Sequence, residues 1–199
     1  MMETLKKKYK DWEKWASAAG KSENGWQSDY PAWSDLMATA ISAMTQKSPS
    51  HEDIEYIDKC WAISEEDEEL SDYAKAHIDQ CWDILHQLTR SAYPDTRWQV
   101  YEVLGYAGPK EEGLLRKGLL DADSYCKRRA LLSLVRLQPD DARQIANQFV
   151  QDPDSDMRLA SIEMVRVSKD SEFINYMKEL LLQDAVAYVR KTAHTLGSP

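Results

Sequence analysis

The sequence predicts an all-α protein built from stacked pairs of antiparallel helices. Its 199 residues include only seven Gly and seven Pro and are rich in Ala, Leu, Glu, Lys and Gln, which favours helix over strand and over disorder. Apolar residues recur at helical spacing along most of the chain. From residue 91 onward one pattern returns every 31 or 32 residues, a period typical of stacked helix pairs. We therefore expect an α-α superhelix, a solenoid, with an N-terminal helical region.

Apolar stripes near the N-terminus indicate the first two helices. Tyr9 and Trp12 stand at helical spacing in a helix that we expect to end at Gly20, and Pro31 marks the start of the next. Six of the seven Trp residues precede residue 90, which fits either a well-filled helical layer or an aromatic recognition surface. Their position on apolar stripes favours packing, and Trp26, in the loop between the two helices, is the exception.

One sequence motif occurs twice, so its two copies could form a paired chemical site. YIDKCWAI is followed 21 residues later by HIDQCWDI. Ser50, which has a carboxylate three positions later, predicts a helix near 51–64. Ser71 can start a second helix near 72–90.

The cysteines and tryptophans of this motif fall on the apolar stripes of the two helices. In an antiparallel hairpin Cys60 and Cys81 would be about 7 Å out of step, at 1.5 Å of rise per residue, so the thiols do not meet. The four His residues show no ligand spacing, and no CxxC pair occurs. We therefore expect buried packing cysteines, without a disulfide, a metal site or a cofactor.

The net charge of -9 is unevenly distributed. Residues 1–90 hold 10 Lys and Arg against 18 Asp and Glu, whereas residues 91–199 hold 15 against 16. An acidic surface repels phosphate backbones and anionic lipid. We therefore expect a basic protein partner rather than nucleic acid or membrane.

Neither an export signal nor a membrane span is expected from the sequence. The basic residues near the N-terminus are not followed by an apolar stretch, and no run of eighteen apolar residues occurs. Three cysteines, an odd number, do not suggest a disulfide framework. These features predict a cytoplasmic protein.

Three C-terminal segments superimpose without gaps: LLDADSYCKRRALLSLVRL, FVQDPDSDMRLASIEMVRV and LLQDAVAYVRKTAHTL. The aligned columns are Asp121, Asp152 and Asp184; Cys126, Met157 and Val189; Lys127, Arg158 and Arg190; and Ala130, Ser161 and Ala193. A more degenerate copy upstream places Arg97 and Val100 in the matching columns.

The pattern Asp-x-x-x-x-Val-Arg-x-x-Ala, complete from Asp184 to Ala193, resembles a HEAT repeat of the short, lyase-type form. The resemblance covers residues 91–199 and implies a HEAT/armadillo-like solenoid, continuous with the acidic, Trp-rich helical region 1–90. It also implies that the repeated residues are scaffolding. The repeated Asp would cap a helix or bond a neighbouring turn, and the repeated base would bond its counterpart in an adjacent repeat.

The second helix of each repeat is expected to line the concave wall, the usual binding face of such arrays. In the helix predicted at 140–151, Ile145 and Phe149 lie on the buried face. The polar positions facing away, together with the matching columns of the other repeats, are the predicted partner-binding residues: Glu112, Arg116, Arg143, Gln144, Asn147, Asn175, Tyr176 and Glu179.

This polar wall of mixed charge suits protein recognition better than catalysis. No nucleophile with a base, paired carboxylates or metal cluster is apparent, and Gly105 and Gly108 are spaced for a helix end rather than a phosphate loop. The leading hypothesis is a non-enzymatic binding module, for example an inhibitor or immunity-type protein that covers the positively charged active site of a basic partner.

Two enzymatic alternatives remain open. Some HEAT-like solenoids are DNA glycosylases for alkylated bases, and Trp98, Tyr101, Tyr106 and the cluster 127–129 could line such a cleft, although acids nearly balance the cations. A lyase-type HEAT protein acting on a cofactor-bearing partner would make Cys126 the nucleophile. Because Cys126 shares a column with apolar residues, packing is the better interpretation.

Overall fold

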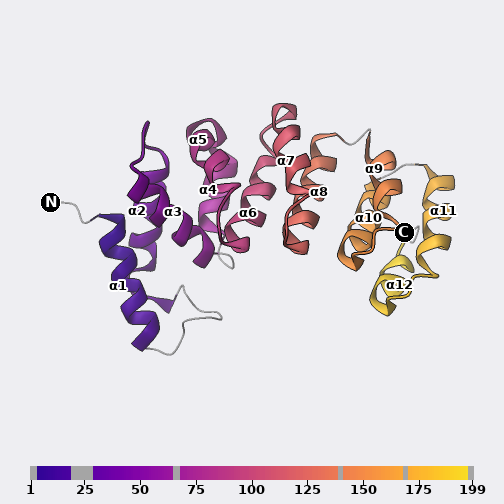
Figure 1. Cartoon of the computed structure of the whole chain (residues 1–199), viewed down its shortest axis with the longest axis horizontal. Helices are drawn as coiled ribbons and strands as arrows, with labels where there is room; N and C mark the ends of the chain where they lie inside the picture. The colour runs from indigo at the N-terminus through magenta and orange to yellow at the C-terminus, as the bar shows by residue number, and fades with distance from the viewer. Residues whose placement is uncertain (1–3, 19–28, 65–67, 139–140, 168–169, 197–199) are drawn as a thin grey trace. The chain divides into compact units, whose positions relative to one another are not determined.

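The computed structural model describes residues 4–18, 29–64, 68–138, 141–167 and 170–196. These residues form helices, turns and loops and contain no β-strand, so the predicted all-α class is confirmed (Figure 1). The chain divides into two compact units, Met1–Val103 and Leu104–Pro199. The expected continuity of the region 1–90 with the repeats stays a prediction. The predicted helix end at Gly20, Trp26 and its loop lie outside the described residues.

The described residues of the first unit form six helices. They are α1 (Leu5–Ala18), α2 (Trp33–Met44), α3 (His51–Ile63), α4 (Glu69–Ala76), α5 (Ile78–Leu88) and α6 (Pro94–Leu104). α1, α2 and α3 pack on one another, and α2 also contacts α4 and α5. Trp12, Trp33 and Trp61 are buried in this unit, as their apolar stripes predict.

The start of α3 follows the predicted cap. The Ser50 hydroxyl accepts a hydrogen bond from the Asp53 amide at 3.1 Å, and the Asp53 carboxylate accepts one from the Ser50 amide. The structure differs from the single helix predicted at 72–90. The observed helical segment begins earlier, at Glu69, and is interrupted at His77, which separates α4 from α5. The His77 ring nitrogen Nδ1 lies 3.0 Å from the Tyr73 carbonyl, and the two rings stack at 4.1 Å. This local contact coincides with the non-helical backbone of His77 that separates α4 from α5.

The two copies of the duplicated motif are not equivalent in three dimensions. Cys60, Trp61 and Cys81 are fully buried, whereas Trp82 is half-buried and contacts the His86 ring in a tilted arrangement, with 4.6 Å between the ring centres. All three cysteines of the chain, including Cys126, are free and buried. The prediction of packing cysteines is confirmed.

A buried polar network joins three helices of the first unit. The Trp61 indole donates to the Ser71 hydroxyl, which in turn donates to the Gln99 carbonyl oxygen at 2.9 Å. The Gln99 amide group donates to the backbone carbonyls of Trp61 and Asp95. Each of these buried groups has a partner, so burial leaves no donor or acceptor of the network unsatisfied.

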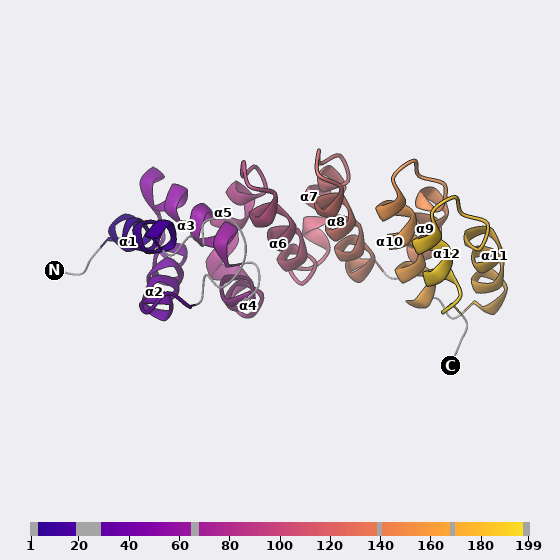
Figure 2. The ribbon, with the colours of Figure 1, turned by 90° about the horizontal axis from the view of Figure 1, so that it is seen from below.

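The second unit is a stack of helix pairs. Its elements are the 3-10 turn η2 (Pro109–Glu111) and the helices α7 (Glu112–Gly118), α8 (Ser124–Leu137), α9 (Ala142–Phe149), α10 (Ser155–Val167), α11 (Ser171–Leu181) and α12 (Ala187–Ala193). α7 packs on α8 and α9 on α10, and both views show these pairs side by side (Figures 1 and 2). α10 contacts α8 on one side and α12 on the other, so α8, α10 and α12 form one closely packed layer.

The aligned columns of the sequence have the same structural role in each repeat. Asp121, Asp152 and Asp184 each accept a hydrogen bond from the backbone amide two residues later, at 2.8–2.9 Å. The apolar columns are buried throughout: Cys126, Met157, Val189, Ala130, Ser161 and Ala193. The prediction that the repeated Asp is scaffolding is confirmed for these turns.

The repeated Arg connects one turn to the next. Arg158 forms a bidentate pair with Asp184 of the following repeat, at 2.6 and 3.0 Å. Arg158 also donates to the carbonyl six residues before it, and Arg190 repeats this bond. Arg97 does the same with the Ser91 carbonyl, and the Ser91 hydroxyl accepts from the amide two residues later. The motif therefore begins at Ser91, within the first unit.

We predict that Arg158→Met lowers the free energy of unfolding of the second unit by about 2–3 kcal/mol, because it leaves the Asp184 carboxylate buried without its partner. Hydrogen bonding to Arg158 holds the pKa of Asp184 below its ordinary value. The pair therefore stabilises the fold above about pH 4 and loses this effect as pH falls further, so the variant and the wild type should converge at low pH.

The measurement is urea denaturation followed by far-UV circular dichroism. All seven Trp lie within residues 12–98, so Trp fluorescence reports the first unit separately. Arg116→Met, which breaks the exposed pair of Arg116 with Glu112, is the control and should cost far less, because solvent screens an exposed pair. An equal loss in both variants would show that the inter-repeat pair has no special role.

Candidate functional site

The predicted partner-binding residues lie on α7, α9 and α11. α9 buries Ile145, Ala146, Phe149 and Val150, which turns Gln144 and Asn147 to solvent. α11 buries Phe173, Met177 and Leu181. The side chains of Asn175, Tyr176 and Glu179 are exposed to solvent on this helix. Tyr176 is 58% exposed, which is unusual for a large aromatic side chain.

Three of the eight predicted residues have intramolecular partners. Glu112 accepts hydrogen bonds from Arg116 and from Gln138 beyond the end of α8, and the Arg116 bond holds the pKa of Glu112 below its ordinary value. Arg143 pairs with Asp170 at 2.6 Å and lies over the Phe173 ring. These three residues hold helices in place, and their role in partner binding stays a prediction.

The remaining five, Gln144, Asn147, Asn175, Tyr176 and Glu179, make no side-chain hydrogen bond or ion pair with the described part of the chain. We call them the α9–α11 surface. Their expected location on an inner wall stays a prediction. α8, α10 and α12 form the closely packed layer of this unit, and α7, α9 and α11 pack against it.

The first unit carries an acidic surface on α4 and α5. Glu69, Asp72, Asp79 and Asp83 are exposed. Lys75, the only Lys or Arg of these two helices, pairs with Asp72 at 3.3 Å and with Glu102 at 3.1 Å. On α5, Asp79, Trp82, Asp83 and His86 stand at i, i+3, i+4 and i+7 and therefore share one face.

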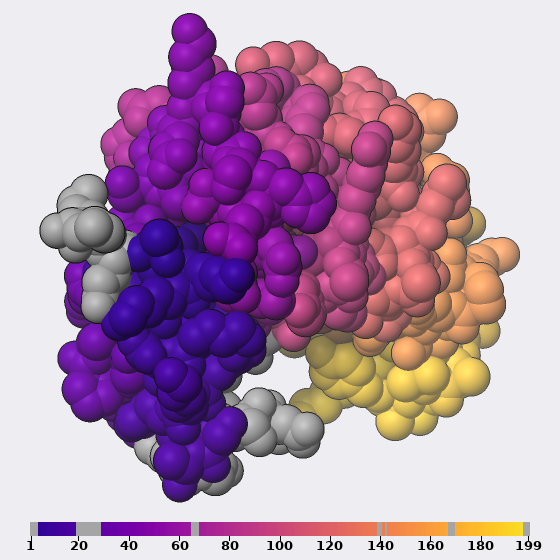
Figure 3. Space-filling view, turned by 60° about the vertical axis from the view of Figure 1, so that its left-hand side comes forward, coloured from indigo at the N-terminus to yellow at the C-terminus, as the bar shows by residue number. Residues whose placement is uncertain are grey.

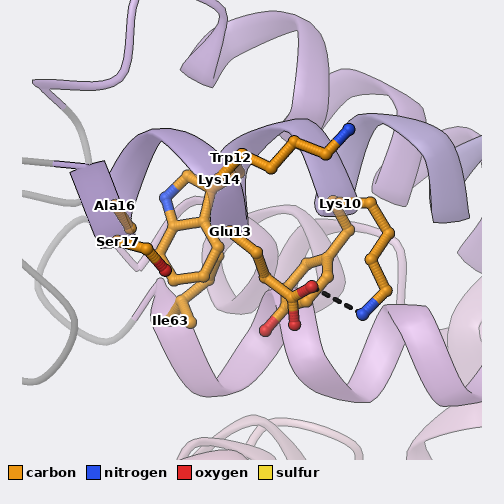
Figure 4. Close-up of a pocket in the computed structure, with 8 residues that line it drawn as sticks. Lys10, Trp12, Glu13, Lys14, Ala16, Ser17 and Ile63 are labelled. Atoms are coloured by element: carbon orange, nitrogen blue, oxygen red, sulfur yellow. Dashed lines mark hydrogen bonds and ion pairs between the residues drawn. The ribbon is translucent and has the colours of Figure 1, made fainter.

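A groove of about 740 Å³ runs along α1 (Figure 4). α1 forms part of the outer surface of the first unit (Figure 3). Tyr9, Trp12, Ala16 and Ile63 supply much of its lining. A pair between Lys10 and Glu13, at 2.6 Å, crosses its rim. Lys14 and Ser17 also line the groove, and the Glu13 carboxylate is held by Lys10 at the rim.

The cysteines are in the wrong environment for nucleophilic catalysis. Burial raises the pKa of Cys81 to about 11 and raises that of Cys60 as well. Cys126, the candidate of the lyase-type alternative, is fully buried in α8. Because the thiolate is the reactive form, these thiols are kept unreactive. Among the described residues no group of three or more His, Cys, Asp or Glu side chains is arranged to hold a metal ion.

The aromatic residues named for the glycosylase alternative are mostly core residues. Trp98 and Tyr101 are only 7% and 5% exposed. Tyr106 is half exposed, but it lies under the Arg136 guanidinium at 4.2 Å. Trp98 and Tyr101 therefore cannot line an open base-binding cleft in this structure. None of the described helices is long and apolar enough to cross a membrane.

Comparison with known proteins identifies the repeat. Residues 112–197 match the family described as HEAT repeats, which confirms the resemblance over this part of the chain. HEAT repeats generally mediate protein–protein interactions. No curated protein and no solved structure matches the chain.

We predict that the native protein reacts slowly with a disulfide reagent such as Ellman's reagent, because all three thiols are buried. Three thiols should react at once in concentrated guanidinium chloride. Immediate labelling of one thiol in the native protein, assigned by mass spectrometry to Cys126, would revive the lyase-type alternative.

Proposed function

We propose that this chain, whose residues 112–197 are HEAT repeats, is a non-catalytic protein-binding module that inhibits a basic partner by covering its positively charged surface. The observation that carries the proposal is the exposed acidic face of α4 and α5. The general role of HEAT repeats in protein–protein interaction supports the class of function. The three buried free thiols fit the reducing cytoplasm as its location.

The acidic face is suited to attract a cation-rich surface. Asp79 and Asp83 are exposed and have no cationic partner among the described side chains. Lys75, half-buried, already pairs with Asp72, Glu68 and Glu102. The negative charge of this face is therefore largely unneutralised. The electric field of such a face speeds association with a basic protein and orients that protein as it approaches.

The same face offers an anchor for close contact. Trp82 lies between Asp79 and Asp83 on α5 and is backed by the His86 ring at 4.6 Å. Trp, Tyr and Arg contribute most of the free energy at many protein interfaces, usually within a rim of polar residues. An aromatic side chain flanked by two carboxylates fits a surface of Arg and Lys, which can pair with the acids and stack on the indole.

The α9–α11 surface supplies a second, nearly neutral contact. It presents amides around the 58% exposed Tyr176 and one carboxylate, Glu179. Amides can donate and accept hydrogen bonds, so they adapt to a polar partner surface. We assign partner contact here to Gln144, Asn147, Asn175, Tyr176 and Glu179, with Glu112, Arg116 and Arg143 as their neighbours.

An inhibitor of the immunity type would act by steric and electrostatic cover alone. An enzyme that acts on a polyanion needs a positively charged active site, and an acidic protein that binds there excludes the substrate. This mode of action requires no catalytic residue in the inhibitor. It agrees with the burial of the three thiols.

We predict that Asp79→Asn with Asp83→Asn weakens binding of the basic partner by about tenfold or more, because two carboxylates are removed from the contact face. The partner is first captured from the native host on the immobilised wild-type chain, and affinity is then measured by titration at low and moderate salt. The loss should be larger at low salt, where screening is weakest.

The matched control is Asp141→Asn with Glu172→Gln, which removes two exposed carboxylates from the second unit. It should leave affinity nearly unchanged. A captured partner that is acidic, or an equal loss in both variants, would contradict the acidic-face proposal. Inhibition is tested by titrating the partner's own activity, which should fall to its minimum near equal concentrations.

We predict that Tyr176→Ala also weakens partner binding by about tenfold, because truncation removes the aromatic anchor of the α9–α11 surface. Tyr188→Ala is the control, since Tyr188 is 56% exposed on α12 of the same unit. Calorimetric titration of both variants measures the difference. Equal affinities of the Tyr176 variant and the wild type would remove this surface from the interface while leaving the α4–α5 face in place.

A further inference from the structure

The groove along α1 has no part in the proposed function. Its volume of about 740 Å³ lies within the range of small-molecule sites, roughly 300–1,000 Å³. Seven of the described lining residues belong to α1, from Tyr9 to Ser17, and Ile63 of α3 adds another. Residues 9–17 extend about 12 Å along a helix axis, at 1.5 Å per residue. The groove is therefore large enough for a molecule of one or two fused rings.

One wall of the groove is aromatic and aliphatic. The rings of Tyr9 and Trp12 lie 5.3 Å apart, at an interplanar angle of 38°. Ala16, one helical turn beyond Trp12, and Ile63 extend this wall (Figure 4). A surface of this kind covers the apolar body of a ligand, which water solvates poorly.

The Trp12 indole brings to this wall a polar group that the protein does not satisfy. Trp12 is only 6% exposed, and its Nε1 has no hydrogen-bond partner in the described part of the chain. A buried donor without a partner is uncommon and costs free energy. Because the ring borders the groove, a molecule bound there can bring an acceptor to the edge of the indole. The groove therefore favours a ligand that carries oxygen atoms as well as an apolar body.

Two further donors line the groove on α1. Lys14 and Ser17 are exposed and stand three residues apart, so they are neighbours on the helix surface. The Lys14 side chain is 79% exposed, and its contact with Asp11 is long, at 3.4 Å, because Asp11 also pairs with Lys7 at 3.2 Å. The Ser17 side chain makes no hydrogen bond with the described part of the chain. An ammonium and a hydroxyl at this spacing can together bind the two oxygens of one carboxylate.

The charge of the groove favours an anion over a cation. The described lining residues hold two cations, Lys10 and Lys14, and one carboxylate, Glu13. Lys10 binds the Glu13 carboxylate at 2.6 Å, so this acid repels a ligand carboxylate only weakly. An ammonium ligand would have to displace Lys10 and lie near Lys14. The groove is thus locally basic, although residues 1–90 as a whole are acidic.

We propose that the α1 groove binds a small amphipathic carboxylate, a molecule with an apolar ring body and one carboxyl group. The body lies against Tyr9, Trp12 and Ile63. The carboxylate accepts hydrogen bonds from the Lys14 ammonium and the Ser17 hydroxyl. This site goes beyond the proposed function, because it takes a small molecule and lies on α1 rather than on the acidic face of α4 and α5 or the α9–α11 surface.

The test is calorimetric titration of the full chain with naphthoate, a carboxylate on two fused aromatic rings. Naphthamide, which has the same rings without the charge, and acetate, which has the charge without the rings, are the comparison probes. We expect naphthoate to bind at one site per chain and the other two to bind about tenfold more weakly or less, because each lacks one of the two contacts. Lys14→Gln with Ser17→Ala should weaken naphthoate by about tenfold and leave naphthamide nearly unchanged.

The control is Lys47→Gln with Ser42→Ala, which removes an exposed ammonium and an exposed hydroxyl from the same unit and should leave naphthoate binding unchanged. Thermal melting verifies that both variants fold, as expected for exposed positions. The proposal fails if no compound binds, if naphthamide binds as tightly as naphthoate, or if the control loses as much affinity. Weaker capture of the protein partner by the Lys14 and Ser17 variant, without any binding of naphthoate, would overturn it by assigning the groove to a protein contact.

Discussion

The turn that begins with a half-buried aspartate is the contact on which the repeat structure depends. At Asp121, Asp152 and Asp184 the carboxylate binds the amide two residues later, which fixes the backbone just before α8, α10 and α12. The helices then start in the same phase, so the columns of Cys126 and Ala130 become buried in every copy. Arg158 adds the connection between repeats by holding the carboxylate of the next turn as well as the carbonyl of its own. This polar contact therefore sets which side of each helix faces the core, and burial of the apolar side chains on that side supplies most of the stabilisation.

This constraint leaves positions outside the buried columns free to vary. The column of Tyr125 continues as Asp156 and Tyr188. The five residues of the α9–α11 surface likewise make no side-chain hydrogen bond or ion pair with the described part of the chain. They therefore differ from the scaffold residues, and such positions are the ones that selection for a partner can change without loss of the fold.

The features that depend on the periodicity of apolar residues could be predicted from the sequence. The helix spacing, the aligned Asp and Arg columns and the burial of Cys60, Cys81 and Cys126 were all predictable, because each follows from which side of a helix is apolar. Two features were not. The break at His77 coincides with a ring contact to Tyr73 that no propensity encodes. The pair of Tyr106 with Arg136 joins residues 30 positions apart, outside any local motif.

α8 departs from the repeat pattern at one column. Arg97, Arg158 and Arg190 each donate to the carbonyl six residues earlier, but Lys127 occupies this column in α8 and makes no corresponding bond among the described residues. A lysine ammonium cannot reproduce the planar fork by which Arg158 binds a carboxylate and a carbonyl together. α8 is thus held by its Asp123 cap and by apolar packing rather than by the Arg contact. The aspartate turn and the apolar columns are therefore enough to place a helix in this stack, and the Arg contact adds to them where it is present.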